Sequence, residues 1–184
     1  AAVSAYVQAA AQALGGIDVL VNNASGFGMS DDEAGWAAGL SVGTYTSPHL
    51  EAINERIAWD GEPIGDEALA AAIGAVAAVE DLAGITASYF EILTAAAFTH
   101  FADVAVDVAV VEVGMLGRYD ATNVVDAQVA VLTNIGHDHT DGVGSWRQAI
   151  AGEKVGIVKP GSTFVCGETD PALRPLFEAT EAAA

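Results

Sequence analysis

Apolar residues follow two patterns that take turns along the chain. Short continuous runs predict strands, and apolar residues at helical spacing predict helices. Short runs rich in valine, leucine and alanine are typical of strands buried on both faces of a parallel sheet. Such runs predict strands at Asp18–Asn22, Val42–Thr46, Val106–Val113, Gln128–Thr133 and Thr163–Cys166. Helical spacing of apolar residues, together with helix start and stop signals, predicts helices between the strands. These helices are expected at Ala1–Leu14, Ser30–Gly39, Pro48–Asn54, Asp66–Leu82, Ala87–Phe101, Ser145–Gly156 and Pro171–Ala183.

This alternation predicts an α/β fold. Buried strands connected by helices are expected to form a three-layer, mostly parallel sheet with helices on both faces. Asp60-Gly61 is a turn signal and predicts a hairpin within Ile57–Ile64. The chain has 184 residues and no linker long enough to separate two domains, so one folded unit is expected from about residue 40 onward.

The composition narrows the possible partners. Asp and Glu number 25 against 6 Lys and Arg, which gives a formal net charge of −19. A surface this acidic carries no basic footprint for nucleic acid and is repelled by an anionic membrane, so neither partner is expected. A solvated acidic surface is the simplest interpretation of the charge. The single cysteine, Cys166, excludes an internal disulfide framework and fits a cytoplasmic protein.

The few basic residues are unevenly placed. None of them lies in the first 55 residues. Enzymes that handle phosphates generally use a lysine or arginine in the phosphate loop. The first third of the chain is therefore a poor phosphate-binding segment by this criterion.

Unusual polar residues follow the predicted strands, where ligands bind in open α/β sheets. Ser47 comes just after Val42–Thr46 and has two interpretations, a helix cap or a hydroxyl ligand for Mg²⁺. Glu112 lies near the end of Val106–Val113. A carboxylate buried there needs a cation partner or a proton, and the cation could be a metal ion or Arg118.

Further candidates follow the next strand. His137 and His139 flank an aspartate, but zinc lacks a third nitrogen or sulfur ligand nearby, and a single imidazole completing a magnesium site fits better. Each histidine taken alone is compatible with an ordinary surface or core position. Lys154 and Lys159 are either solvated lysines or amines that act near the metal ligands, and their spacing does not decide between these alternatives.

Five ordered motifs between Gly39 and Gly161 carry a family resemblance. They are GLSVGTYTSPHLEAINERI (Gly39–Ile57), YFEILTAAAF (Tyr89–Phe98), VDVAVVEVGMLGRYDATNVV (Val106–Val125), VAVLTNIGHDHT (Val129–Thr140) and AGEKVGIVKPG (Ala151–Gly161). Together they resemble the folylpolyglutamate synthase and dihydrofolate synthase family within the Mur-type ligases. The resemblance implies a fold like the central domain of these ligases.

The resemblance also implies a reaction and a site. The family's reaction is an ATP-dependent amide ligation in which a substrate carboxylate becomes an acyl phosphate that the glutamate amine attacks. Magnesium and ATP are the implied cofactors, and folate or dihydropteroate and glutamate are the implied partners. By motif, Ser47, Glu112 and His139 correspond to magnesium ligands, and Lys154 to a carbamylated lysine; His139 and Lys154 are thus the implied catalytic residues. Leu116 stands where glycine is more usual.

The segment before these motifs departs from the family. A phosphate loop of the form G-T-N-G-K-[ST] is expected there, but the chain has GGIDVLVNNASGFGMSDDEAGW (Gly15–Trp36), which resembles the N-N-A-[GS] region of short-chain dehydrogenases. Asp31, Asp32 and Glu33 would open the following helix with charges that repel phosphate. The sequence therefore predicts a chimera, with residues 1–39 dehydrogenase-like and residues 40–184 a partial Mur ligase-type ATP-binding domain.

This departure leaves three functional hypotheses. The first is a ligase fragment that is impaired because it lacks the phosphate loop and the C-terminal domain, and no nucleotide-binding residue is predicted for it. The second is a non-catalytic recombined α/β domain. The third is a dehydrogenase-like nucleotide binder, although the dehydrogenase glycine motif, catalytic serine and Tyr-x-x-x-Lys are not recognisable and hydride transfer is not expected.

Overall fold

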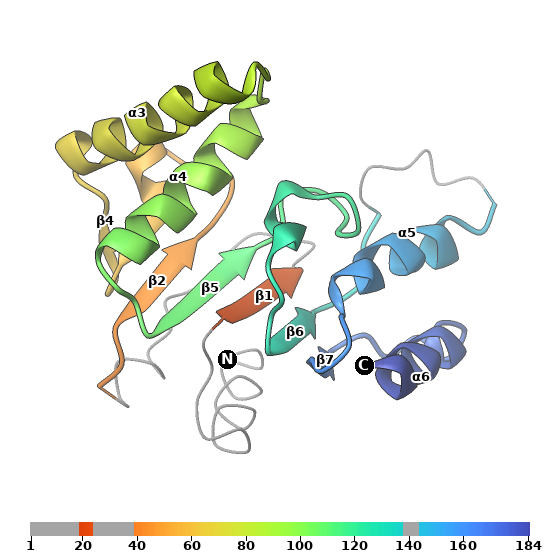
Figure 1. Ribbon diagram of the computed structural model, residues 1–184. Coiled ribbons are helices and arrows are strands. Elements are labelled where there is room, and N and C mark those ends of the chain that lie inside the picture. Colours follow the sequence, from red (N-terminus) through yellow and green to blue (C-terminus); the bar gives the residue numbers. More distant parts are fainter. Residues whose placement is uncertain (1–18, 24–38, 138–143) are drawn as a thin grey trace. The chain divides into compact units, whose positions relative to one another are not determined.

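The computed structural model describes residues 19–23, 39–137 and 144–184 (Figure 1). The strands are β1 (Val19–Asn23), β2 (Val42–Tyr45), β3 (Ile57–Trp59), β4 (Glu62–Pro63), β5 (Val108–Glu112), β6 (Val129–Leu132) and β7 (Thr163–Cys166). The helices are α3 (Asp66–Ala83), α4 (Tyr89–Asp103), α5 (Trp146–Lys154) and α6 (Arg174–Ala183), with short 3-10 helices η1 (Ile53–Arg56), η2 (Ala121–Val124) and η3 (Val155–Ile157). The helices predicted at Ala1–Leu14 and Ser30–Gly39 lie outside the described residues, except for Gly39 at the end of the second.

The chain forms two compact units. The first unit consists of Ala1–Ser30 and Val111–Ala184, and the second unit consists of Asp31–Val110. The boundary between them falls within β5. The predicted division into residues 1–39 and 40–184 stays a prediction, and each compact unit is described by itself below.

The second unit contains an antiparallel meander and two helices. β2 pairs with β3, and β3 pairs with β4, with Gly43 opposite Trp59 and Ala58 opposite Pro63. The hairpin turn has Asp60 and Gly61 at φ 49° and 83°, the left-handed values that the Asp-Gly signal predicts. The Oδ1 atom of Asp60 accepts a hydrogen bond from the Val42 amide at 2.7 Å, which ties the turn to β2.

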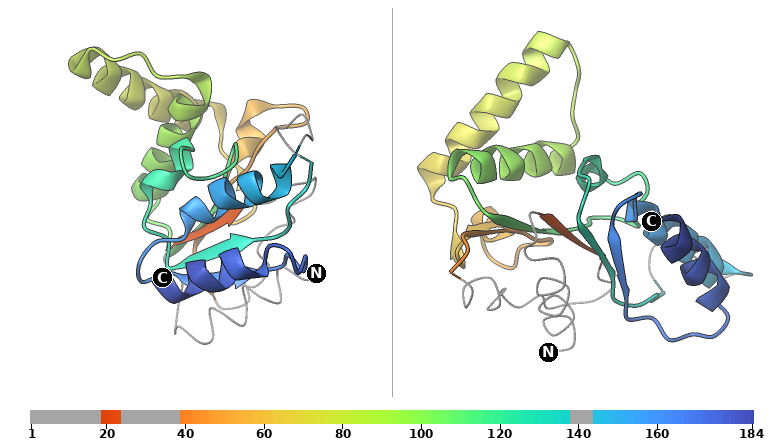
Figure 2. Two further views of the ribbon diagram at one scale, coloured as in Figure 1. Left: turned by 90° about the vertical axis from the view of Figure 1, so that its right-hand side faces the viewer. Right: turned by 60° about the horizontal axis from the view of Figure 1, so that its bottom comes forward.

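Local sequence explains where the two helices of the second unit begin and end. α4 begins with a capping box, in which the Ser88 hydroxyl accepts from the Glu91 amide and the Glu91 carboxylate accepts from the Ser88 amide. α3 ends at Gly84, whose φ of 65° suits a residue without a Cβ. α3 packs against α4 (Figure 2), and α4 packs against β2.

The helix predicted for Pro48–Asn54 is wrong. Only a single 3-10 turn, η1, forms in that region, and it begins at Ile53. The amides of Leu50, Glu51 and Ala52 instead donate to the carboxylate of Glu55. Glu55 therefore caps the start of η1, and residues 47–52 form an irregular loop before it.

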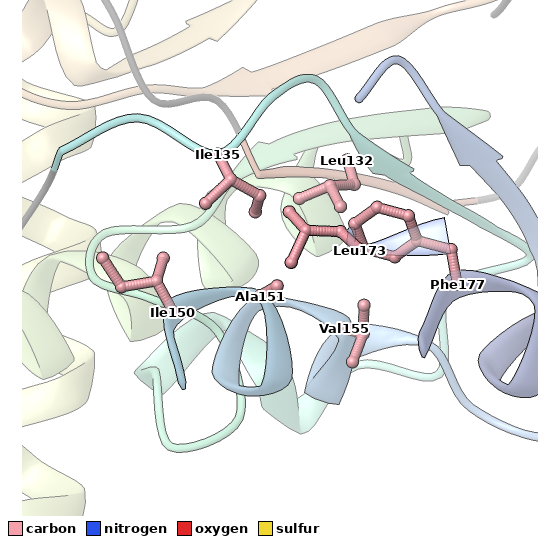
Figure 3. Packing of buried hydrophobic residues seen from close by; sticks show 7 residues of the cluster. All are labelled: Leu132, Ile135, Ile150, Ala151, Val155, Leu173 and Phe177. Atoms are coloured by element: carbon pink, nitrogen blue, oxygen red, sulfur yellow. The ribbon is translucent and has the colours of Figure 1, made fainter. Parts of the chain in front are cut away.

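The first unit contains the parallel part of the fold. β1 pairs with β6 and β6 pairs with β7, both in parallel, with Val21 opposite Ala130 and Val131 opposite Val165. Ile150 of α5, Val155 of η3 and Phe177 of α6 are buried in one cluster with the side chain of Leu132 from β6 (Figure 3). Each of these side chains stabilises the unit by about 1.5–3 kcal/mol through removal of apolar surface from water.

The predicted α/β class is confirmed, with a sheet that contains both parallel and antiparallel pairs. The described helices include none that is both long enough and apolar enough to cross a membrane.

Two glycine substitutions test the packing of α4 on β2. A Cβ at Gly43 would lie 2.7–2.9 Å from three ring atoms of the buried Phe101, whereas a Cβ at Gly74 within α3 would meet nothing within 4 Å. We expect Gly43→Ala to lower the free energy of unfolding by about 1–3 kcal/mol through overpacking. Gly74→Ala should raise it by about 0.5–1 kcal/mol because alanine loses less backbone entropy in a helix.

Urea denaturation followed by circular dichroism measures both changes. Equal effects of the two variants would contradict the close packing of Phe101 on β2.

Candidate functional site

Glu112 brings a carboxylate into the interior at the end of β5. All five residues of this strand are buried, and Glu112 is 9% exposed. Taking a charged carboxylate out of water costs several kcal/mol unless a cation or hydrogen bonds offset the cost. The burial of Glu112 at the carboxyl end of a strand is thus compatible with a cation-binding carboxylate, and equally with an internal ion pair or hydrogen bond.

The loop after β5 is held in shape by Asp120. One carboxylate oxygen of Asp120 accepts from the Met115 amide at 2.8 Å, and the other accepts from the amide and the hydroxyl of Thr122 at 2.9 and 2.6 Å. Leu116 has a φ of 58°, a left-handed conformation that suits glycine better. Its side chain packs against the hydrophobic cluster of the first unit, which compensates for the unfavourable backbone conformation.

This loop closes tightly on the carboxyl end of α5. The last carbonyls of a helix have no partner within the helix, and the amide of Arg118 donates to one of them, Glu153 O, at 3.0 Å. A Cβ at Gly117 would lie 2.9 Å from Glu153 O and 3.0 Å from Lys154 O. The backbone of the loop therefore reaches α5 at a distance that only glycine permits without a shift.

A second glycine makes the reciprocal contact. A Cβ at Gly156, in η3, would lie 2.6 Å from the Cβ of Arg118. The Asn123 side-chain amide donates to the carbonyls of Arg118 and Gly156, at 2.9 and 3.2 Å. The Arg118 guanidinium donates to Gly152 O at 3.1 Å and lies 3.9 Å from a Glu153 carboxylate oxygen. The loop and the end of α5 thus form one interlocked structure.

Lys154 is the last residue of α5 and is 1% exposed. It belongs to the same buried helix face as Ile150 and Ala151, so the period of the helix and its carboxyl-terminal contacts place it in the interior. The interpretation of Lys154 as a solvated lysine is therefore wrong. A lysine this deeply buried is unusual.

Lys159 is also held by the protein. Its ammonium donates to Asn123 O at 2.9 Å and to Val125 O at 2.6 Å, and it lies 3.1 Å from a carboxylate oxygen of Asp126. These contacts anchor the residues around η2. The solvated interpretation fails here too, and the contacts of Lys159 are structural.

Ser47 lies in the second unit, in the loop that Glu55 organises. The backbone amides of Leu50, Ala52 and Glu51 lower the pKa of the Glu55 carboxyl below its ordinary value, against a smaller opposing effect of burial. No helix begins next to Ser47, so the interpretation of its hydroxyl as a helix cap is wrong. Ser47 is half-buried, and its peptide bond to Pro48 is cis.

Arg56 supports the same loop from the interior. Its side chain is buried, and its Nε donates to Nδ1 of His49 at 2.9 Å. The guanidinium carbon also lies 5.5 Å from the centre of the Tyr89 ring, within range of a cation–π interaction. Glu55 and Arg56 are therefore positioning residues for the Ser47 loop, and they were not predicted from the sequence.

The loop after β6 is only partly described. His137 is exposed and makes an edge contact with the ring of Trp146, with centroids 5.0 Å apart. The predicted ligand His139 lies outside the described residues. Ser47 belongs to the second unit and Glu112 and Lys154 to the first, and the described ranges bring no three His, Cys, Asp or Glu side chains together as a metal cluster.

Glu168 is a functional candidate that was missed. It follows β7 and accepts hydrogen bonds from the backbone and from Arg147. Burial raises the pKa of Glu168, but the amides of Ile135, Asp170 and Thr169 and the charge of Arg147 more than offset this and leave it lowered. The signal available in the sequence was its place at the carboxyl end of a predicted strand, Thr163–Cys166, whose loop was not among those considered.

Comparison with known proteins shows the family to which the chain belongs. The Mur ligase middle domain matches residues 67–184, which is more than half of the chain. The chain belongs to the Mur ligase family. Among curated relatives, a dihydrofolate synthase/folylpolyglutamate synthase of Bacillus subtilis (strain 168) is 43% identical over 139 residues, which cover 73% of this chain and 32% of the relative. The corresponding Escherichia coli (strain K12) protein is 42% identical over 135 residues, covering 73% of this chain and 31% of the relative.

Solved structures of this ligase group are also similar. The bifunctional folylpolyglutamate synthase/dihydrofolate synthase of Yersinia pestis, complexed with AMPPNP and Mn ion, matches with a TM-score of 0.78 and 32% identity, over 96% of this chain and 45% of that one. The Mycobacterium tuberculosis folylpolyglutamate synthase complexed with ADP matches with a TM-score of 0.77 and 34% identity, over 97% and 44%. The present chain spans about a third of the length of these curated relatives.

The interlock between the loop and α5 predicts the effect of a single methyl group. Gly117→Ala should lower the free energy of unfolding by about 1–3 kcal/mol because its Cβ meets two backbone carbonyls that cannot rotate away. Gly152→Ala is the matched control, because Gly152 lies within α5 and a Cβ there would meet nothing within 4 Å. This change should leave the free energy of unfolding unchanged or raise it. Urea denaturation of both variants checks the prediction, and an unchanged midpoint for Gly117→Ala would refute the close contact.

The lowered pKa of Glu168 predicts a dependence of stability on pH. The ionised carboxylate stabilises the folded state above the unfolded pKa of about 4.3, and this contribution is lost as the pH falls through the lower folded pKa. The difference in unfolding free energy between the natural chain and Glu168→Gln should therefore be constant above about pH 5 and shrink in acid. Urea titrations between neutral and acidic pH measure it, with Glu178→Gln as the exposed control; a difference that grows in acid would contradict the assignment.

Proposed function

We propose that this chain is part of a folylpolyglutamate synthase or dihydrofolate synthase and provides metal-binding residues of its central domain. Such an enzyme converts a folate or dihydropteroate carboxylate into an acyl phosphate at the expense of ATP, and the glutamate amine then displaces phosphate to form the amide. The observation that carries the proposal is the burial of Glu112 and Lys154 in one unit, with the loop after Glu112 locked onto the backbone of Lys154. Family membership makes this arrangement part of a ligase rather than of an unrelated α/β protein.

Ser47, Glu112 and His139 are the proposed magnesium ligands. A hydroxyl and a carboxylate are hard oxygen donors of the kind that magnesium prefers, and one imidazole completes the set. The metal would neutralise charge on the phosphates during phosphoryl transfer. The support in this chain is the buried carboxylate of Glu112, and the related Yersinia pestis structure contains Mn ion together with AMPPNP.

Lys154 is the proposed site of carbamylation. The neutral amine of Lys154 adds to CO₂ and releases one proton, so that the side chain ends in a carboxylate-like carbamate. That group would hold a second metal ion, whereas an ammonium would repel it. Full burial supports this role because it removes Lys154 from the solvated state typical of lysine.

Nucleotide binding is proposed to be weak in this chain. The segment Gly15–Trp36 stands where a phosphate loop is expected, and the first 55 residues contain no lysine or arginine. The chimeric origin of residues 1–39, a cytoplasmic location and impaired ligation belong to this same proposal. The non-catalytic domain and the dehydrogenase-like nucleotide binder remain the alternatives, without support from the comparisons.

The metal assignment predicts that the isosteric change Glu112→Gln weakens Mn²⁺ binding by at least about tenfold, because it removes a charged ligand and keeps the volume. Glu67→Gln, an exposed change in the first turn of α3, is the matched control and should leave the affinity unchanged. Isothermal titration of the full chain with MnCl₂ measures both. Equal Mn²⁺ affinity of the natural chain and Glu112→Gln would refute the assignment.

Titration with nucleotides separates the hypotheses about the first segment. Tight binding of Mg·ATP would contradict the proposed impairment. Binding of NAD⁺ instead of ATP would favour the dehydrogenase-like alternative.

A further inference from the structure

Asn123 connects the loop after β5 to the segment that follows α5. Its side-chain nitrogen donates to Arg118 O at 2.9 Å and to Gly156 O at 3.2 Å. Both acceptors are carbonyl oxygens, so only the NH₂ end of the amide can face them. The half-buried side chain of Asn123 therefore holds together two segments that are distant in the sequence.

This connection and the Arg118 amide hold the backbone on both sides of Lys154. The Arg118 amide donates to Glu153 O at 3.0 Å, one residue before Lys154, and Asn123 binds the carbonyl of Gly156, two residues after it. Lys154 is the last residue of α5, and the ends of a helix are the parts that open most readily. The two contacts therefore restrain the turn whose opening would displace Lys154.

Lys159 holds Asn123 in place from the other direction. Its ammonium donates to Asn123 O at 2.9 Å and to Val125 O at 2.6 Å. The side chain of Asn123 thus reaches from η2 to η3, and the side chain of Lys159, two residues beyond η3, reaches back to the backbone of η2. Asn123 takes part in both connections between these segments.

The burial of Lys154 depends on a closed helix end. Lys154 is 1% exposed, and its long side chain loses rotamer freedom when it is fixed in the interior. If the end of α5 opened, Lys154 would return to water, where lysines are usually found. The contacts of Asn123 oppose this opening.

We propose that Asn123 is a positioning residue for Lys154. It holds η3 against the loop after β5, so that Lys154 stays in the interior, where its carbamate forms. In that step a bond forms between Nζ of Lys154 and the carbon of CO₂, and one proton passes from the nitrogen to solvent. The inference rests on the carbamylation proposed for Lys154, and it adds a residue and a mechanism that this role does not contain.

The test measures the carbamate by ¹³C nuclear magnetic resonance of the full chain in ¹³C-bicarbonate at constant pH. A carbamate signal that Lys154→Gln lacks belongs to Lys154. Asn123→Ala removes both hydrogen bonds that the side chain donates. We expect it to raise the bicarbonate concentration needed for half occupancy of Lys154 about tenfold, the scale of effects from residues that orient metal ligands.

Asn54→Ala is the matched control. Asn54 is also half-buried and lies in a 3-10 helix, but it belongs to the second unit. Its side-chain nitrogen likewise donates twice, to Ile64 O at 2.7 Å and to a carboxylate oxygen of Asp66 at 3.0 Å. This change should lower the free energy of unfolding and leave the carbamate signal of Lys154 unchanged, so the comparison separates positioning from a general loss of stability.

A second variant tests the connection from the side of Lys159. Lys159→Gln keeps Asn123 but removes the ammonium that holds its backbone, and should lower the carbamate occupancy in the same direction with a smaller effect. Near-ultraviolet circular dichroism establishes that each variant retains its tertiary structure. If Asn123→Ala does not, the result for Lys159→Gln decides.

The outcomes separate this inference from the proposed function. Unchanged carbamate occupancy of Lys154 in folded Asn123→Ala overturns the positioning role. Absence of a Lys154 carbamate in the natural chain overturns the proposed carbamylation. In that case reductive methylation with formaldehyde, followed by mass spectrometry, decides whether Asn123 keeps Lys154 in the interior: faster methylation of Lys154 in Asn123→Ala supports the inference, and equally slow methylation overturns it.

Discussion

The contact between the loop after β5 and the carboxyl end of α5 is the constraint on which the first unit depends. Gly117 approaches the carbonyls of Glu153 and Lys154, and the Arg118 amide donates to the first of them. The contact adds a hydrogen bond to a carbonyl at the helix end, and it fixes the backbone of Lys154 beside the loop that begins after Glu112. Stability and site geometry thus have a common origin here, because the residues that complete the helix also hold the candidate chemistry in place.

The basic side chains also hold segments of the structure together. The chain has only six basic residues against 25 acidic ones, and at least four of the basic side chains bind groups within the protein. Arg56 supports the Ser47 loop, and Arg118 and Lys159 bind backbone carbonyls around the end of α5 and η2. Arg147 joins the start of α5 to the loop after β7 through Glu168 and Asp170. Each guanidinium or ammonium gains several partners at partly buried positions, where charge-assisted hydrogen bonds are stronger than in water. The acidic character follows from the composition, because six cations cannot balance 25 carboxylates.

The sequence predicted the regular elements well where one pattern dominates. The hairpin at Asp60-Gly61 and the strand Thr163–Cys166 form as predicted, because turn chemistry and short apolar runs act locally. The helix predicted from Pro48 does not form. Glu55 instead accepts from the amides of Leu50 and Ala52 and caps the short turn η1, an interaction between a side chain and the backbone that periodicity does not reveal. Glu168 was missed for a similar reason, since its partners Ile135 and Arg147 are distant in sequence and meet only when β6 and β7 pair. The burial of Lys154 likewise depends on tertiary contacts that its spacing from other residues could not decide.

The central claim is that the chain binds a divalent metal ion through Glu112 and its partner ligands. A crystal structure of the full chain grown with MnCl₂, with anomalous diffraction data collected near the manganese absorption edge, tests it most directly. The account predicts an anomalous peak at coordination distance from the carboxylate of Glu112. No peak at Glu112, in crystals whose Mn²⁺ concentration exceeds the dissociation constant measured in solution, would contradict it.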